Sequence, residues 1–517
     1  MEGLAKPLLH DICLKRFAMT ALIANLFEDS ITKEKIKEVI RTKYNRSIRF
    51  PFEALKEEIN KLTFKKLEEL NLSKELMPET EGILIIFTKK IIAWTEYIIK
   101  ILKFDLSYID DIYWTSLGTI DEAKIFDKYW RKHGNLSKFL TNDHENREMV
   151  PELACDYANE EIILSCQNKL IKEVIKFLKN VKVSSIKNKV EKLAAIYICY
   201  SYGEGYDLMM EKNVYSRFKQ TGKVNISEII FICADQGLSQ AMKFFWKYLD
   251  NTEKQNVMAK LAFYSLHGQL SSSYMTSDPR LPDLYEKYEH YDEIESARGA
   301  EMVHFLLNQM SLEQRNKFLK ENIGGIVKLF LLVWPYQELL LKILDLKSVE
   351  QWMSEINDEN GEDMLYAPLY RMIKDGLSDS CVYQNIFHEV LRKVMKIVPR
   401  YQKTERLFDQ MHYEFEDIED LEVIEVFYDR FDVVALSIII NDKDLEEERD
   451  RMLSMGRDKI YELKRDGKIE SLISFMENVL ISNGERKKFI KQYCLADDIL
   501  KSDNPDIKDK VLRWVIV

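Results

Sequence analysis

Histidine and cysteine are the side chains of this sequence best suited to nucleophilic or metal chemistry. The 517 residues include eight histidines and seven cysteines, the latter at positions 13, 155, 166, 199, 233, 381 and 494. No CxxC or HExxH sequence occurs, and no two histidines stand four residues apart, so the spacing predicts no metal site. A cysteine–histidine pair forms only in space, so an enzyme assembled from distant residues stays open as an alternative. Because most cysteines lie in apolar, helical stretches, buried thiols are favoured.

Glycine-rich phosphate loops are incomplete in this sequence. "TGKVN", residues 221–225, lacks the upstream glycine of a phosphate-binding loop, and "YGEGYDL", residues 202–208, contains only GxG. Backbone cradling of a phosphate needs the full glycine pattern before a helix. We therefore expect no nucleotide or other cofactor, and we favour a protein without catalytic activity.

The N-terminal "PLLHDICLKRFA", residues 7–18, carries the most suggestive binding pattern. Its Leu9, Ile12, Cys13 and Phe17 would share one face of a helix. The spacing Leu9-x-x-x-Cys13-x-x-x-Phe17 resembles the elongin-C-binding box of cullin-RING substrate receptors, with Leu8 where a small residue or proline is usual. The resemblance implies that Leu9 fills a pocket of elongin C and that Cys13 packs beside it. An ordinary amphipathic first helix is the alternative.

Composition predicts a mostly helical, globular chain. Hydrophobic residues make up 46% of the sequence and charged residues 31%, and there are only 17 glycines and 10 prolines, so turns and strands are scarce. The net charge of −11 argues against a nucleic-acid partner. The scattered cysteines indicate a reducing compartment, the cytoplasm or the nucleus, and the N-terminus lacks a secretory pattern. We expect no membrane partner, because charges interrupt the apolar stretch 83–104, which is predicted to be a core helix.

Self-similar segments recur from about residue 118 onward. They are "CADQGLSQAMKFFWKYL" (233–249), "SARGAEMVHFLLNQM" (296–310), "LKRDGKIESLISFMENV" (463–479) and the variant "SCQNKLIKEVIKFLKNV" (165–181). Each has a glycine or asparagine followed by two adjacent large apolar residues. This pattern predicts a helix, a tight turn with positive φ, and a second helix that packs on the next unit.

These segments resemble ankyrin repeats. Ala234 through Phe245 fits the end of one ankyrin helix and the start of the next, and "APLYRMIKDG", residues 367–376, fits TPLHxAAxxG through Pro368, Leu369 and Gly376. Bulky residues replace the usual alanines, and β-hairpin fingers are missing or reduced. The resemblance implies an all-α fold, a degenerate ankyrin-like helical-repeat solenoid with an N-terminal helical domain. Phrases along most of the chain are also similar to a group of arthropod proteins, spider proteins in particular, which implies no function.

The organisation we expect has five parts. They are an N-terminal helical domain (1–117), a first helical-repeat block (118–267), an inserted exposed loop (268–295), a second helical-repeat block (296–500) and a C-terminal capping segment (501–517). Within them, 76–82 is predicted to be a break, a helix is expected to start near Thr119 after a turn at Gly118, and 409–432 to be an amphipathic helix with an acidic face.

These observations favour a protein-binding scaffold. The partner is a protein of unknown identity. A ubiquitin-ligase substrate receptor that recruits elongin C through residues 8–17 is the first alternative, and an enzyme is the second.

Overall fold

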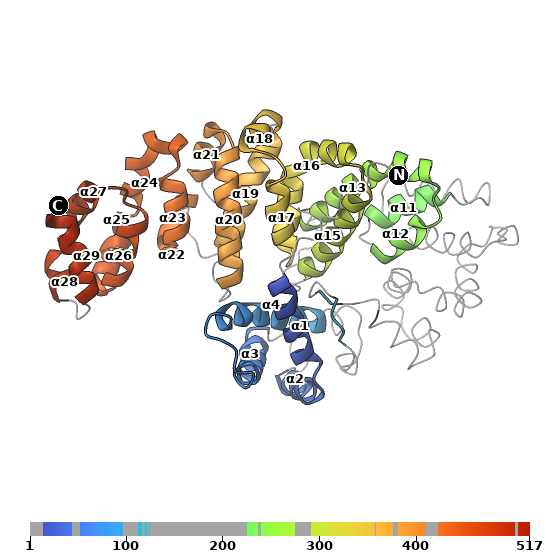
Figure 1. Ribbon diagram of the computed structural model, residues 1–517, viewed down its shortest axis with the longest axis horizontal. Coiled ribbons are helices and arrows are strands. Elements are labelled where there is room, and N and C mark those ends of the chain that lie inside the picture. The colour runs from blue at the N-terminus through green and yellow to red at the C-terminus, as the bar shows by residue number, and fades with distance from the viewer. Residues whose placement is uncertain are drawn as a thin grey trace, which may run out of the picture. The chain divides into compact units, whose positions relative to one another are not determined.

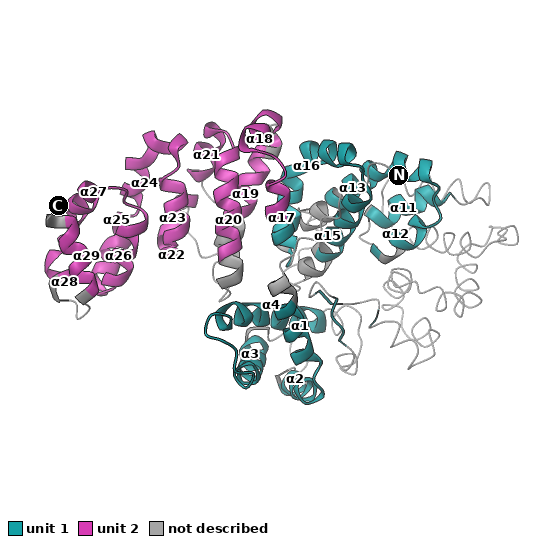
Figure 2. Ribbon diagram, in the orientation of Figure 1, with its two compact units in different colours: residues 1–339, 380–382 teal, residues 340–379, 383–517 magenta. Residues whose placement is uncertain are grey.

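The computed structural model describes residues 14–43, 52–96, 112–115, 119–120, 124, 225–235, 239–274, 291–334, 336–356, 358–375, 381–408, 422–501 and 505–516. The chain forms two compact units, residues 1–339 with 380–382 and residues 340–379 with 383–517 (Figure 2). The expected boundaries of the five parts stay predictions.

The described residues are helical throughout, apart from turns and isolated bridge residues, among them the antiparallel pair Trp114 and Ile120. The all-α prediction is confirmed. None of the helices in the described ranges is both long enough and apolar enough to cross a membrane. A helix was expected to start near Thr119; Ile120 forms the bridge, Lys124 is helical, and residues 121–123 lie outside the described ranges.

In the first group of helices in unit 1, α1 and α3 pack against α4, and α2 packs against α3 and α1 (Figure 1). From Ile83 to Phe87 every side chain of α4 is buried, as are Ile91 and Trp94, so the prediction of a core helix in stretch 83–104 is confirmed for its described part. The break expected at 76–82 instead opens the helix, which begins at Met77. These helices are α1 (Leu14–Glu28), α2 (Ser30–Lys43), α3 (Phe52–Glu68) and α4 (Met77–Glu96).

The second group in unit 1 is built around α13, which contacts α11, α15 and α16. One expectation fails here, because Gly299 lies inside α15 and ends no helix. The segment 268–295 stays a predicted insert: α13 runs to Tyr274 and α15 starts at Tyr291, and residues 275–290 lie outside the described ranges. These helices are α11 (Ile226–Asp235), α12 (Ser239–Trp246), α13 (Asn251–Tyr274), α15 (Tyr291–Gln309) and α16 (Leu312–Leu332); α17 (Tyr336–Leu344) spans the division between the units.

Unit 2 is a succession of helices that are mostly short after α20. They are α18 (Val349–Glu355), α19 (Asp358–Asp375), α20 (Cys381–Ile397), α21 (Arg400–Leu407), α22 (Val423–Arg430), α23 (Val433–Ile440), the 3₁₀ turn η5 (Lys443–Glu448), α24 (Arg449–Met455), α25 (Arg457–Arg465), α26 (Ile469–Asn478), α27 (Asn483–Gln492), α28 (Ala496–Lys501) and α29 (Pro505–Ile516).

Pro368 corrects the prediction for "APLYRMIKDG". It lies inside α19 and does not start a helix, because the acidic residues ahead of it are already helical. The loss of one backbone donor is tolerated within this longer helix. The helix ends at Asp375, directly before Gly376.

Two other predicted segments are described only in part or not at all. In the acidic run 409–432 the helix α22 buries Ile424, Phe427 and Tyr428 and exposes Asp429, as the amphipathic pattern predicts; residues 409–421 lie outside the described ranges. The repeat variant 165–181 also lies outside them.

Candidate binding surface

The predicted elongin-C-binding residues fall at the start of the described chain. Leu9, Ile12 and Cys13 lie outside the described residues. Phe17 is part of the helix α1, but only its backbone is described. The box therefore lies mostly outside the described residues and stays a prediction. The rest of α1 buries Ile23 and Phe27.

Three helix pairs in unit 2 share one turn geometry, and they are the candidate for a binding surface. The pairs are α22–α23, α25–α26 and α27–α28, and each turn contains one residue with a left-handed backbone: Phe431 (φ 54°), Gly467 (φ 70°) and Cys494 (φ 50°). In each, the N–H of the following residue donates to the carbonyl five residues back, the Schellman arrangement that satisfies a helix C-terminus. These bonds are Asp432 N–H to Phe427 O (3.1 Å), Lys468 N–H to Leu463 O (2.9 Å) and Leu495 N–H to Ile490 O (3.0 Å).

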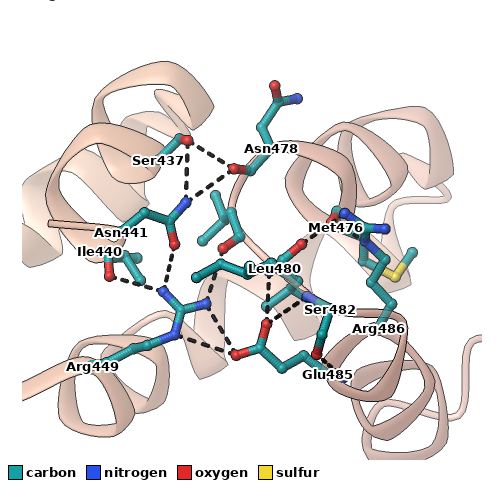
Figure 3. A network of polar contacts seen from close by, with 12 residues as sticks. Ser437, Ile440, Asn441, Arg449, Met476, Asn478, Leu480, Ser482, Glu485 and Arg486 are labelled. Carbon is teal, nitrogen blue, oxygen red and sulfur yellow. Dashed lines mark hydrogen bonds and ion pairs between the residues drawn. The ribbon is translucent and has the colours of Figure 1, made fainter. Parts of the chain in front are cut away.

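Arg449, at the start of α24, links the ends of α23, α26 and α27 (Figure 3). Its Nη1 donates to Ile440 O (2.8 Å) and to Asn441 Oδ1 (2.5 Å), where α23 ends. Its Nη2 donates to Val479 O after α26 (3.1 Å) and to Glu485 Oε1 of α27 (3.1 Å). A planar guanidinium with five donors fits such a fork of acceptors, and its charge opposes the negative ends of two helices.

Glu485 completes this network on the side of α27. Its Oε2 accepts from the backbone N–H groups of Ile481 (2.7 Å) and Ser482 (3.1 Å), and the Ser482 side chain accepts from Glu485 N–H, which forms a capping box. Burial raises the pKa of the Glu485 carboxyl, but these backbone donors and the charge of Arg449 outweigh burial and hold the pKa below its ordinary value. Glu485 is therefore ionised at neutral pH and directed inwards.

Two more basic side chains tie neighbouring helix pairs through backbone carbonyls. Lys464 of α25 donates to Tyr493 O (2.8 Å) and Cys494 O (3.2 Å) in the turn after α27. Arg486 of α27 donates to Met476 O (2.9 Å) and Leu480 O (2.8 Å) at the end of α26 (Figure 3), and its guanidinium lies 5.2 Å from the centre of the Trp514 ring. The helices from α23 to α29 are thus held by directional contacts as well as by apolar packing.

The helices before this region are joined to it by charged pairs. The fully buried Lys403 of α21 donates to Asp442 (3.1 Å) and Asp444 (2.6 Å) at η5. His388 Nε2 of α20 lies 2.9 Å from Asp432 Oδ2, and Asp432 also caps α23 by accepting from Ala435 N–H. Burial raises the pKa of Asp432, but the hydrogen bond and charge of His388 together with the backbone N–H groups of Ala435 and Val434 outweigh burial and lower the pKa overall.

A polar cluster in unit 1 gathers serine, lysine, glutamate and histidine, the side chains of many catalytic sites. Ser239 Oγ donates to Glu301 Oε2 (3.1 Å), and Lys243 pairs with the same carboxylate. His304 Nε2 is bonded to Asn308 (2.8 Å), so its partner is an amide and not a nucleophile. Nucleophilic catalysis needs a base bonded to the attacking group, which this cluster lacks. No group of three or more metal-ligating side chains occurs within the described ranges.

Of the two cysteines whose side chains are described, one is buried as expected and one is not. Cys233 is buried and Cys494 is exposed, because Cys494 occupies the left-handed turn position, where its side chain faces solvent.

The sequence did not predict the linking role of Arg449, Lys464 and Arg486. The available signal was faint: each is a basic residue in the first or last turn of a short polar helix, and many solvated residues share that description.

Comparison with protein-family models, with curated proteins and with solved structures found no match for this chain.

Proposed function

We propose that this chain is a non-catalytic protein-binding scaffold, with the helix pairs of residues 422–516 as a stack of degenerate repeat units. The observation that carries the proposal is the shared turn of the three pairs α22–α23, α25–α26 and α27–α28. A helix pair cannot bury its apolar face alone, and stacked pairs that present one face in succession are a common design of binding proteins.

The contacts between pairs support a rigid array. Arg449 of α24 and Arg486 of α27 donate to backbone carbonyls at the end of α26. These hydrogen bonds fix the position of both helices relative to α26. Rigid surfaces bind with a smaller loss of conformational entropy than flexible ones. The enzyme alternative gains no support from the Ser239–Glu301–His304 cluster, whose hydrogen bonds are not those of a nucleophile and its base.

Co-purification followed by sizing tests the proposal. Tagged chain is isolated from its native tissue, retained proteins are identified against an unrelated tagged helical protein, and the leading candidate is recombined with purified chain. A complex of fixed stoichiometry by light scattering, with slower amide exchange in 422–516 than in the free chain, is expected. If no recombined candidate forms a complex or alters exchange there, the proposal is wrong.

A substrate receptor for a cullin-RING ligase is the second candidate. The observation in its favour is that α1 includes Phe17, so the last position of the Leu9–Cys13–Phe17 pattern is helical. Micromolar chain mixed with an elongin B–C pair is expected to co-migrate in size exclusion, and Leu9→Ala with Cys13→Ala is expected to abolish the shift. Leu70→Ala, at an exposed apolar position, is the matched control. Separate migration of the unmodified chain would eliminate this candidate.

A further inference from the structure

The sequence contains two asparagine–glycine pairs, and the structure places them in different surroundings. Asn483 and Gly484 open α27 and are both exposed, and a Cβ added at Gly484 would meet one side-chain oxygen, at 3.7 Å. Gly361, which follows Asn360 in the first turn of α19, is buried, and a Cβ there would overlap Gln402 of α21. One pair is therefore open to water, and the other has its glycine packed against a neighbouring helix.

The side chain of an asparagine is open to attack by the backbone nitrogen of the residue that follows it. The nitrogen forms a bond to the side-chain carbonyl carbon, the bond from this carbon to the amide nitrogen breaks, and ammonia leaves with the proton of the backbone nitrogen. Water then opens the cyclic imide at either carbonyl, which yields aspartate or isoaspartate. Glycine in the second place permits the attack because it has no Cβ to crowd the nitrogen.

The start of α27 favours this attack. Gly484 is the second residue of the helix, so its N–H has no acceptor within the helix, and Ser482 Oγ at the cap accepts from the next N–H, that of Glu485 (3.1 Å). The positive end of the helix stabilises the backbone nitrogen once it has lost its proton. Arg486 Nη1 donates to Asn483 Oδ1 (3.1 Å) and so polarises the carbonyl group that is attacked. The helical backbone holds the reacting groups apart until the first turn opens, and opening costs little at an exposed helix end.

We propose that Asn483–Gly484 is a site of spontaneous deamidation, with water as the co-reactant, and that its isoaspartate product releases α27 from its cap. In isoaspartate the backbone runs through the former side chain, so an extra methylene separates residue 483 from Gly484. The N–H and carboxylate of Glu485 then move away from Ser482 and Arg449, which they contact in the intact chain (Figure 3). The aspartate product keeps the backbone and adds a carboxylate to the first turn, where a negative charge is favourable. This modification does not depend on the scaffold function.

Mass spectrometry of full-length chain aged at neutral pH tests this inference, with the second pair as a control inside the same molecule. Both pairs read Asn-Gly-Glu, so their local chemistry is matched. Conversion of amide to acid at Asn483 is expected to be at least about tenfold faster than at Asn360, a ratio that corresponds to about 1.4 kcal/mol in the free energy of local opening. In concentrated urea, where both helices are unfolded, the two rates are expected to be similar.

Two variants separate the chemical step from its consequence. Gly484→Ala has room for its methyl group and is expected to slow the reaction at Asn483 at least about tenfold, because the Cβ crowds the attacking nitrogen, and to leave the rate at Asn360 unchanged. Asn483→Asp reproduces the aspartate product and is expected to keep the amide exchange of α27 as slow as in the fresh chain. The isoaspartate fraction of aged chain, isolated by ion exchange, is expected to show faster amide exchange in α27.

The site would be rejected by equal rates at the two asparagines in the folded chain, by an unchanged rate in Gly484→Ala, or by a difference between the two asparagines that persists in urea. The consequence for α27 would be rejected by amide exchange in the isoaspartate fraction that matches the exchange of the fresh chain. Because these measurements use the isolated chain, they leave the test of the scaffold function unaffected.

Discussion

The ring of Tyr428 lies so close to Gly456 that the glycine has no room for a side chain. A Cβ added at Gly456 would lie 2.6 Å from Tyr428 Cζ and closer still to Cδ1 and Cε1. The backbone of Gly456, at φ −75° and ψ 1°, suits any residue. Space, and not backbone freedom, therefore requires glycine between α24 and α25.

We expect Gly456→Ala to lower the free energy of unfolding by about 2–3 kcal/mol, because the buried Tyr428 ring must move against α26 to admit the methyl group. Urea denaturation followed by circular dichroism measures the change. Gly484→Ala is the matched control: its Cβ would meet only Ser482 Oγ at 3.7 Å within α27, so a gain of about 0.5–1 kcal/mol is expected. Equal effects at the two glycines would contradict the steric explanation.

Arg449 provides a second test of the helix array. Arg449→Ala leaves Glu485 without its cation and several helix-end carbonyls without their donor, and we expect a loss of about 2–4 kcal/mol in the free energy of unfolding. Arg449→Lys keeps the charge but not the forked donors, so an intermediate loss is expected. Arg465, 77% exposed and paired with its neighbour Asp466, is the control, with a change within about 0.5 kcal/mol on substitution by alanine. An equal loss of stability in Arg449→Ala and Arg465→Ala would contradict the proposal that Arg449 links these helices.

Of the three left-handed turns in unit 2, the sequence predicted the one at Gly467 and not those at Phe431 and Cys494. Gly467 could be assigned because glycine adopts positive φ without strain. Phe431 and Cys494 hold the same backbone against the usual cost for residues with a Cβ, so neither residue type signals the turn. Here the flanking helices fix the conformation: Phe431 stacks on Phe475 of α26, with ring centres 5.7 Å apart. Such tertiary compensation is invisible in a sequence.

Glycine and proline also predicted breaks that do not exist. Gly299 continues α15 and Pro368 continues α19, because packing on both sides of a long helix outweighs the local penalty of about 1 kcal/mol for glycine and about 3 for proline. The all-helical fold and the core position of α4 followed from apolar periodicity, which averages over many residues. The links made by Arg449 and Lys464 depend on single contacts between distant residues, which periodicity does not encode.

Lys403 gives a third prediction, because its ammonium group is fully buried beside two carboxylates. Lys403→Met should cost about 3–5 kcal/mol by leaving Asp442, itself 11% exposed, without its cation. Adding Asp442→Asn to this variant should recover at least about 1 kcal/mol, since the amide oxygen still caps η5 and no uncompensated charge is left at that position. Lys66→Met, which removes an exposed pair with Glu69, is expected to stay within about 0.5 kcal/mol. A double variant less stable than Lys403→Met would contradict the electrostatic account.

His304 makes the stability of unit 1 depend on pH. Burial, helped by the nearby charge of Lys243 and opposed by Glu301, lowers the pKa of its imidazole from 6.5 to about 4. The folded chain therefore binds no proton at His304 between these values, whereas the unfolded chain does. Stability is unaffected by this group above pH 6.5 and decreases as the pH falls from 6.5 towards 4, by up to about 3 kcal/mol.

The comparison that isolates this contribution is between the natural chain and His304→Gln, which replaces the imidazole with a side chain that does not titrate. Urea unfolding of both at a series of pH values gives the difference in their free energies of unfolding. We expect this difference to be constant above pH 6.5 and to shift in favour of the variant at lower pH, with a slope approaching about 1.4 kcal/mol per pH unit. A difference that does not change between pH 7 and pH 4 would mean that His304 protonates equally in both states, and the burial of its ring beside Tyr336 would then not control its charge.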